Sequence, residues 1–162
     1  MKSLEEEIMA QKTVTTFAEL KSAIEDSTTT EILLAKDIVF SSGGIKIPKT
    51  KGNISIDGAG HTITDYNSGA YTDTIYFSPS AGTAVTATMK NAVWNGRNYY
   101  GILCVYDSTN NNNVTTVLDN IKYTGPQPVY NRNGITRIKD CTISIEKNGS
   151  VGDSQEFCEG NR

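Results

Sequence analysis

Apolar and polar residues alternate along most of the chain, and several segments repeat one version of this alternation. In each of them, β-branched or apolar residues alternate with small polar ones, a polar pair follows, and the apolar alternation then resumes. The segments are Asn53–Ile63, Val85–Trp94, Val114–Tyr123 and Ile135–Ile145. The polar pair recurs after 29 residues from Asn91 to Asn120 and after 20 residues from Asn120 to Asp140. A strand–corner–strand unit that recurs in this way predicts coils stacked on one another, a β-solenoid.

The polar pair of each repeat is expected to form the corner of its coil. The pairs are Asp57-Gly58, Lys90-Asn91, Asp119-Asn120 and Lys139-Asp140. Asp and Asn side chains tolerate the left-handed backbone conformation of tight corners and bond to nearby polar groups. Stacked corners should therefore form a short ladder of hydrogen bonds, with Asp57, Asn91, Asp119 and Asp140 at the repeated corner.

A single amphipathic helix is predicted ahead of the first strands. Thr16 and Glu19 have the spacing of a capping box, and Phe17, Leu20 and Ile24 then fall on one face of two to three helical turns. The first coil of a solenoid has an open end with exposed apolar core and unpaired strand edges. The helix is expected to cover that end.

Other strands are predicted between the repeats, and the polar stretches between them are expected to be loops. These strands are Glu31–Phe40, Ile45–Pro48, Thr74–Ser78 and Tyr99–Tyr106. Beyond Lys147 the alternation fades into polar residues. Residues 1–12 are acidic and lack the apolar core of a secretory signal, so they are expected to be a leader or an added segment. Residues 13–162 are expected to be one β-helix domain.

Composition agrees with this architecture and excludes some classes of partner. The 37% hydrophobic content suits a thin core, and 14 Gly with only 4 Pro favour β structure with tight corners. A net charge of −3 without basic clusters argues against nucleic acid. No apolar run is long enough for membrane insertion. Three cysteines give no disulfide framework, and Cys104 and Cys141 are expected to pack in the core.

Catalysis is not supported by the acidic and basic residues. The candidate acids are Asp57, Asp65, Asp73, Asp107, Asp119 and Asp140, three of which belong to the repeated corner. Asp65 and Asp73 on one loop fall short of the oxygen ligands that calcium needs unless backbone carbonyls help, so neither a metal nor a cofactor is expected. The single His61 is expected to pack at a corner, and Arg97, Arg132 and Arg137 lack the calcium-rich surroundings of a lyase base.

Aromatic residues offer a ligand-binding surface instead. They are interspersed with Asn, Gln and Ser, and comprise Tyr66, Tyr71, Tyr76, Trp94, Tyr99, Tyr100, Tyr106, Tyr123 and Tyr130. Rings beside amide side chains can stack on sugars or supply rigid contact area for a protein. Tyr99 and Tyr100 are neighbours in a predicted strand, so one of them should face outward. With Trp94 and Arg97 they form the predicted ligand-binding residues.

The order of the segments resembles that of a known family. The helix TFAELKSAIED, the strand TEILLAKDI and the coil GNISIDGAGHTIT precede the coils with MKNAVWNG, LDNIKYTGPQPVYN and IKDCTISI. This order is similar to that of the pectate-lyase-like adhesive domains of Gram-positive bacterial surface proteins, over about residues 13–160. The resemblance implies a right-handed parallel β-helix with an N-terminal capping α-helix, used for adhesion without catalysis. The chain lacks the family's export signal, later coils and wall-attachment segment, so it is expected to be an N-terminal fragment of a longer solenoid.

These observations favour a non-catalytic adhesion module on the cell surface, in the cell wall or outside the cell. Its exposed coil faces would bind a glycan or protein of a host or of another cell surface. Two alternatives remain: a fragment of a polysaccharide lyase or glycoside hydrolase of the pectate-lyase-like superfamily, and a structural spacer. No cap is predicted for the C-terminal coil, so its unpaired edges are expected to allow end-to-end self-association.

Overall fold

The computed structural model describes residues 11–40, 43–67, 70–77, 84–106, 113–132 and 134–146. These residues form two β-sheets, and every pairing between their strands is parallel. The larger sheet contains β1 (Gln11–Val14), β2 (Glu31–Leu34), β3 (Ile38–Phe40), β5 (Ile54–Asp57), β6 (Thr62–Asp65), β8 (Val85–Asn95), β10 (Val114–Gly125), β12 (Ile135–Lys139) and β13 (Thr142–Ile145). The smaller sheet contains β4 (Ile45–Ile47), β7 (Ile75–Phe77), β9 (Leu103–Val105) and β11 (Val129–Asn131). The helix α1 (Phe17–Glu25) and the 3₁₀ turn η1 (Tyr71–Asp73) complete the described elements.

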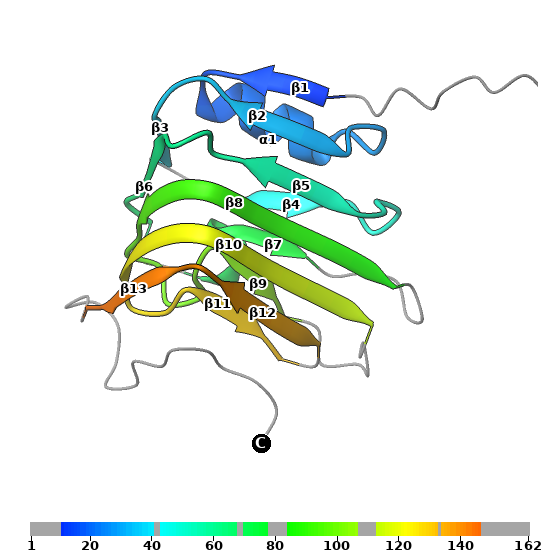
Figure 1. The fold of residues 1–162 in the computed structure, drawn as a ribbon. Helices are drawn as coiled ribbons and strands as arrows, with labels where there is room; N and C mark the ends of the chain where they lie inside the picture. Colours follow the sequence, from blue (N-terminus) through cyan, green and yellow to red (C-terminus); the bar gives the residue numbers. More distant parts are fainter. Residues whose placement is uncertain are drawn as a thin grey trace, which may run out of the picture.

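The strands of successive repeats lie side by side in the larger sheet (Figure 1), so the predicted repeat is confirmed as a structural unit. Its register stacks inward-facing apolar side chains in columns. One column contains Ile32, Ile56, Met89, Leu118 and Ile138. Another contains Ile38, Ile63, Trp94, Tyr123 and Ile143. The smaller sheet adds the column Ile45, Ile75, Leu103 and Val129, and the hydrophobic core lies between the two sheets.

The corner ladder predicted from the polar pairs is present. Asn91 and Asn120 have φ of 53°, in the left-handed region that Asn tolerates better than most residues. Asn120 Nδ2 donates to Asn91 Oδ1 at 2.9 Å, and Asn91 Nδ2 donates to Asp57 Oδ1 at 3.1 Å. Asp140 also has a left-handed backbone, with φ of 52°. These residues allow β8 and β10 to bend around the corner as continuous strands.

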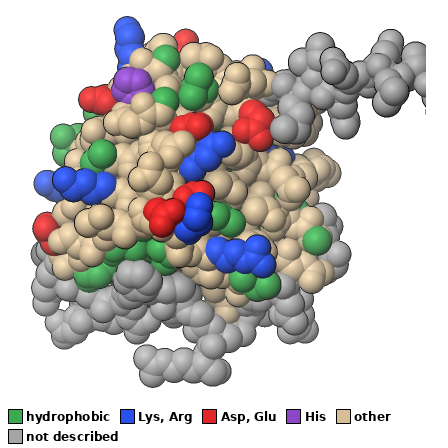
Figure 2. All heavy atoms as spheres, in the orientation of Figure 1, with side chains coloured by type: hydrophobic (Ala, Val, Ile, Leu, Met, Phe, Trp, Pro, Cys, Tyr) green, Lys and Arg blue, Asp and Glu red, His purple; other side chains and the backbone are tan. Residues whose placement is uncertain are grey.

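The acids of the repeats alternate with lysines, which corrects the grouping of Asp57, Asp119 and Asp140. The register aligns Asp57 with Lys90, Lys90 with Asp119, and Asp119 with Lys139. Lys90 Nζ lies 3.7 Å from Asp57 Oδ2, and Lys139 Nζ lies 3.7 Å from Asp119 Oδ1. Figure 2 shows acidic and basic side chains interspersed over this face of the larger sheet. Only Asp140 shares the left-handed corner position with the asparagines.

The predicted helix α1 begins and packs as expected. Thr16 Oγ1 accepts from the Glu19 amide at 3.2 Å, while the Glu19 carboxylate accepts from the Thr16 amide at 3.2 Å, which completes the capping box. Leu20 and Ile24 are buried, and the Phe17 ring packs against Phe40 with 4.6 Å between centroids. The helix lies behind β1 and β2 at the N-terminal end of the stack and contacts β4 (Figure 1).

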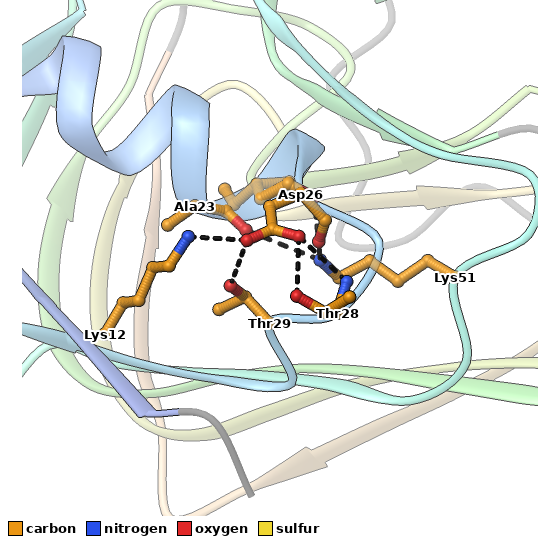
Figure 3. A network of polar contacts seen from close by, with 7 residues as sticks. Lys12, Ala23, Asp26, Thr28, Thr29 and Lys51 are labelled. Carbon is orange, nitrogen blue, oxygen red and sulfur yellow. Dashed lines mark hydrogen bonds and ion pairs between the residues drawn. The ribbon is translucent and has the colours of Figure 1, made fainter.

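A buried lysine caps the other end of the helix, a contact that the sequence analysis missed. Lys51 Nζ donates to the backbone carbonyls of Ala23 at 3.4 Å, Ile24 at 2.9 Å and Asp26 at 2.5 Å. The Asp26 carboxylate in turn accepts from Lys12 Nζ at 2.5 Å, which links β1 to the same network (Figure 3). Burial lowers the pKa of Lys51 to about 8, although the nearby charge of Asp26 opposes this shift.

Two predicted strands are wrong in their extent. The segment from Glu31 to Phe40 divides into β2 and β3, and the segment from Tyr99 to Tyr106 contains only the short strand β9. A turn at Tyr99 and Tyr100 replaces the start of the latter. It ends at Gly101, whose φ is 72° and whose Cβ, if it had one, would lie 2.4 Å from the Pro128 carbonyl oxygen. The turn therefore forms because the backbone of Gly101 lies against that of Pro128, a contact between segments far apart in the sequence.

Several predictions concern residues outside the described ranges. They include the proposed leader before Gln11, the candidate acid Asp107 and the tail beyond Glu146. The strand β1 begins at Gln11, inside the proposed leader, and the domain boundary after residue 12 stays a prediction. Cys104 is buried and Cys141 is half-buried against the core, as expected.

Candidate functional site

Trp94 belongs to the core and not to a ligand-binding surface, which corrects its assignment from the sequence. Its side chain is 1% exposed. The indole ring packs edge-on against Phe40 with 5.5 Å between centroids, and the register places it between Ile63 and Tyr123 of the adjacent coils. A ligand on the surface cannot contact this ring.

Arg97 lies on the surface beside another aromatic residue. It is exposed, and its guanidinium carbon lies 5.6 Å from the centroid of the Tyr66 ring. That distance is within the range of a cation–π contact. The Tyr66 side chain is 54% exposed, so the pair offers a cation and an aromatic ring on the same surface.

Tyr99 and Tyr100 belong to a group of four aromatic rings. Their centroids are 5.5 Å apart, and Tyr100 also lies 5.8 Å from Tyr106 and 5.1 Å from Tyr130. Tyr106 and Tyr130 stack with 5.8 Å between centroids and 28° between planes. We call Tyr99, Tyr100, Tyr106 and Tyr130 the tyrosine cluster. Tyr99 and Tyr100 lie in a turn and not in the predicted strand, and their role in ligand binding stays a prediction.

The smaller sheet positions the tyrosine cluster on its outer face. Ile75 and Phe77 point into the core, so Tyr76 between them points outward, and the register aligns Tyr76 with Cys104 and Cys104 with Tyr130. Cys104 is nevertheless buried, in this outward row between two tyrosines. Burial raises the pKa of its thiol well above the usual range. Cys104 is therefore part of the packed base of the cluster.

Tyr106 gives the tyrosine cluster its most accessible ring. It directly follows β9, and its side chain is 38% exposed, whereas Tyr130 is 5% exposed. Tyr106 and Tyr130 are among the aromatic residues of the sequence, but the predicted site did not include them. The signal that connects them is the pairing of β9 with β11, which no local pattern reveals.

The arrangement can supply contact area and hydrogen bonds. Within the described ranges, the aligned acids Asp57 and Asp119 do not pair with each other. Tyrosine rings present rigid apolar faces with a polar edge, which suits both sugar rings and protein side chains. Asp57 and Asp119 lie beside lysines, and His61 Nδ1 lies 3.3 Å from Asp37 Oδ1 at an exposed corner. In the described ranges, no group of three or more His, Cys, Asp or Glu residues could hold a metal ion. Within those ranges too, no helix reaches the length and apolarity needed to cross a bilayer.

The chain is similar to one protein family and to two solved structures. The profile of the pectate lyase-like adhesive domain family matches residues 11–130. The SRRP structure of L. reuteri 53608 is similar, with 25% identity and a TM-score of 0.64 over 82% of the chain. A second SRRP structure, from L. reuteri 100-23, has 21% identity and a TM-score of 0.58 over 78% of the chain and supports the fold alone. The chain spans 43% and 36% of these two structures, and no curated protein matches it.

Proposed function

Because the chain belongs to the family of pectate lyase-like adhesive domains, we propose that it binds a glycan or protein ligand at a cell surface through its exposed coil faces. It is an adhesion module and not an enzyme, as the description of the family as an adhesive domain indicates and the similarity to the SRRP structure supports. The lyase and hydrolase alternatives do not fit, since the aligned acids alternate with lysines. The same relationship supports an extracellular or cell-surface location, which remains part of the proposal.

The proposed architecture is a right-handed parallel β-helix, with α1 covering its N-terminal end. The parallel register of successive coils supports it, because parallel strands in one sheet are connected with right-handed crossovers in nearly all proteins. The similarity to the SRRP structures also supports it. Stacked coils offer long, regular faces on which an adhesion surface can be built.

The tyrosine cluster carries the proposal of a ligand site. Each of its four rings has a neighbouring ring at 5.1–5.8 Å between centroids, so this packing leaves few side-chain conformations to be lost on binding. Tyrosine is among the residues that contribute most to binding energy at interfaces. The Arg97–Tyr66 pair is a second exposed aromatic surface and is included in the proposed site.

Substitution of Tyr106 by Ala is expected to weaken attachment to the ligand by roughly tenfold or more, because one aromatic hot spot contributes at least about 1–2 kcal/mol. A glycan array and a cell-attachment assay measure the effect. Tyr106→Phe keeps the ring and separates stacking from hydrogen bonding by the hydroxyl. Val39→Ala, on the larger sheet, removes another exposed apolar side chain and should leave binding unchanged.

The spacer alternative makes the opposite prediction. If the chain only separates other domains, neither Tyr106→Ala nor Tyr100→Ala changes attachment, and the wild-type chain shows no specific signal on the array. That combined result would remove the proposed ligand site.

Self-association at the C-terminal end of the stack is also proposed. In the last described coil, the core side chains Ile138, Ile143 and Ile145 are only half-buried. Apolar surface and strand edges of this kind favour pairing with another chain. Sedimentation velocity should therefore show a mean mass that rises with concentration. A mass equal to that of a monomer at every concentration would contradict this proposal.

A further inference from the structure

A groove runs along the stacked corners of the larger sheet. The bends of β8 and β10 lie one above the other on the left of Figure 1, and the groove follows them. Its volume is about 520 Å³, within the range of sites that bind small molecules. One side of the groove is the corner row of Asp57, Asn91, Asn120 and Asp140. The groove therefore lies on a different sheet from the tyrosine cluster.

The hydrogen-bond ladder of the corners leaves polar atoms available along this row. An Asn amide has two N–H donors, and the ladder uses one of Asn91 and one of Asn120. Among the described residues, none donates to Asn120 Oδ1. The register continues from Asp119–Lys139 to Lys122–Thr142, so Asn120 is aligned with Asp140 of the next coil. A carboxylate has no N–H to donate, so the ladder stops at Asn120 Oδ1.

A second row of side chains forms the other side of the groove. The register aligns Val93 with Lys122 and Lys122 with Thr142, and all three line the groove. Val93 is half-buried, while Lys122 and Thr142 are exposed. The stem of a lysine offers apolar surface while its ammonium group stays in water. A ligand in the groove thus meets amides on one side and C–H groups on the other. A sugar ring has the complementary surfaces, with hydroxyls at its edge and C–H groups on its faces.

The spacing and charge of the groove narrow the class of sugar. Adjacent coils are about 4.8 Å apart, close to the length of one sugar residue in an extended β-linked chain. The row from Asp57 to Asp140 covers three such spacings, roughly 14 Å. The charged lining residues are Asp57, Asp140 and Lys122, so acids exceed bases and an acidic sugar is disfavoured. Among the described lining residues there is no aromatic side chain, the usual anchor of a protein partner.

We propose that this corner groove binds a neutral, extended β-linked glycan whose chain lies along the stack of coils. Asn120 Oδ1 and the Asp140 carboxylate accept from sugar hydroxyls, and the remaining N–H groups of Asn91 and Asn120 donate to them. Val93 and the stem of Lys122 pack against the sugar C–H groups. The inference rests on the proposed function, and it deepens that function by naming a glycan class and a site apart from the tyrosine cluster.

Titration of the isotope-labelled chain with cellotriose, β-linked mannotriose and chitotriose tests the proposal by NMR spectroscopy. The readout is the side-chain amide signals of Asn91 and Asn120, which lie in the groove. We expect both signals to shift saturably with at least one of the three. Maltotriose has the same length, but its α-linkages curve the chain. It should bind at least about fivefold more weakly, which corresponds to one lost hydrogen bond.

Asn120→Gly should weaken binding roughly tenfold or more, because it removes both an acceptor and a donor. Gly adopts the left-handed backbone without strain, so the corner itself is kept. Asn95→Gly is the matched control. It removes an exposed amide at the end of β8, outside the groove lining, and should bind the trisaccharide as the wild type does.

Asp140→Asn tests the ladder end directly. The new amide supplies the donor that Asn120 Oδ1 lacks, so the midpoint of thermal unfolding should rise. The same bond occupies the acceptor that the glycan would use, so binding should weaken by roughly fivefold. A corner with a structural role alone would show the first change without the second.

Three outcomes would overturn the corner site. They are no saturable shift of the two amide signals with any β-linked trisaccharide, unchanged binding in Asn120→Gly, and an equal loss of binding in Asn95→Gly. If Asn120→Gly does not fold, Asp140→Asn decides the question, because its side chain is 70% exposed. Tyr106→Ala should leave the corner shifts unchanged, so failure of the tyrosine cluster as a ligand site is distinguishable from failure of this one.

Discussion

Replacement of Trp94 by Ala is expected to lower the free energy of unfolding by about 3–5 kcal/mol, the usual cost of truncating a large buried aromatic side chain. The ring is 1% exposed and lies in the column between Ile63 and Tyr123, with its edge against Phe40. Neither adjacent coil can move into the cavity, because the backbone pairing of β8 with β6 and β10 fixes their spacing. The decrease in the free energy of unfolding should therefore include the whole cost of the cavity left by the indole ring.

Urea denaturation followed by circular dichroism measures this change. Trp94→Phe keeps most of the volume and should cost less, and Arg97→Ala, a surface change near Trp94 in sequence, should stay within about 0.5 kcal/mol. Below its unfolding transition, the Trp94→Ala protein should retain ligand binding. If Trp94→Ala instead kept the stability of the wild type and lost ligand binding, Trp94 would be a ligand-binding residue and not a core residue.

Replacement of Lys51 by Met is expected to cost about 2–4 kcal/mol, because it leaves the last carbonyls of α1 without their donor in a buried site. The ammonium group satisfies the carbonyls of Ala23, Ile24 and Asp26, and a cation at a helix C-terminus also interacts favourably with the helix dipole. Met matches the length and apolar stem of Lys, so the loss reports mainly on the hydrogen bonds and the charge.

The pH dependence of this loss has a definite sign. Burial lowers the pKa of Lys51 from its usual 10.5 to about 8 in the folded chain. Between these values the unfolded chain binds more protons, so this group makes the folded state more stable as pH rises. The difference between wild type and Lys51→Met should thus be larger near pH 10 than near pH 7.

Lys49→Met provides the matched control for Lys51→Met. Lys49 is an exposed lysine in the same turn, and its replacement should change stability by less than about 0.5 kcal/mol at either pH. Equal stability of Lys51→Met and the wild type would mean that water satisfies the helix carbonyls as well as the ammonium group does.

The local features of the sequence determined the helix and the corners. Thr16 and Glu19 specify the start of α1 by bonds within one helical turn, and the face formed by Leu20 and Ile24 specifies which side is buried. Asn91 and Asn120 specify the corners because few other residues adopt a left-handed backbone at little cost. These interactions involve residues that are close in the sequence, so they can be predicted from the sequence alone.

The ligand surface depended on contacts between distant segments. At the corner, Lys90 and Asn91 both lie outside the core, which resets the inward and outward alternation, so the pattern alone could not place Trp94 inside. Tyr99 and Tyr100 turn because Gly101 approaches Pro128, and Tyr106 meets Tyr130 because β9 pairs with β11. From the sequence, Lys51 is only a polar residue of a turn. Its contact with the Ile24 carbonyl depends on how α1 packs in the folded chain.

The sequence by itself thus determined the strand–corner–strand unit, the capped helix and membership of an adhesive family, since these depend on local backbone preferences and on the order of segments. The tertiary structure alone decided which aromatic rings reach the surface and that Asp65 lies inside with an unpaired oxygen. Both depend on which residues face one another across adjacent coils. That register is set by pairings of residues 20–33 positions apart, to which no local pattern responds.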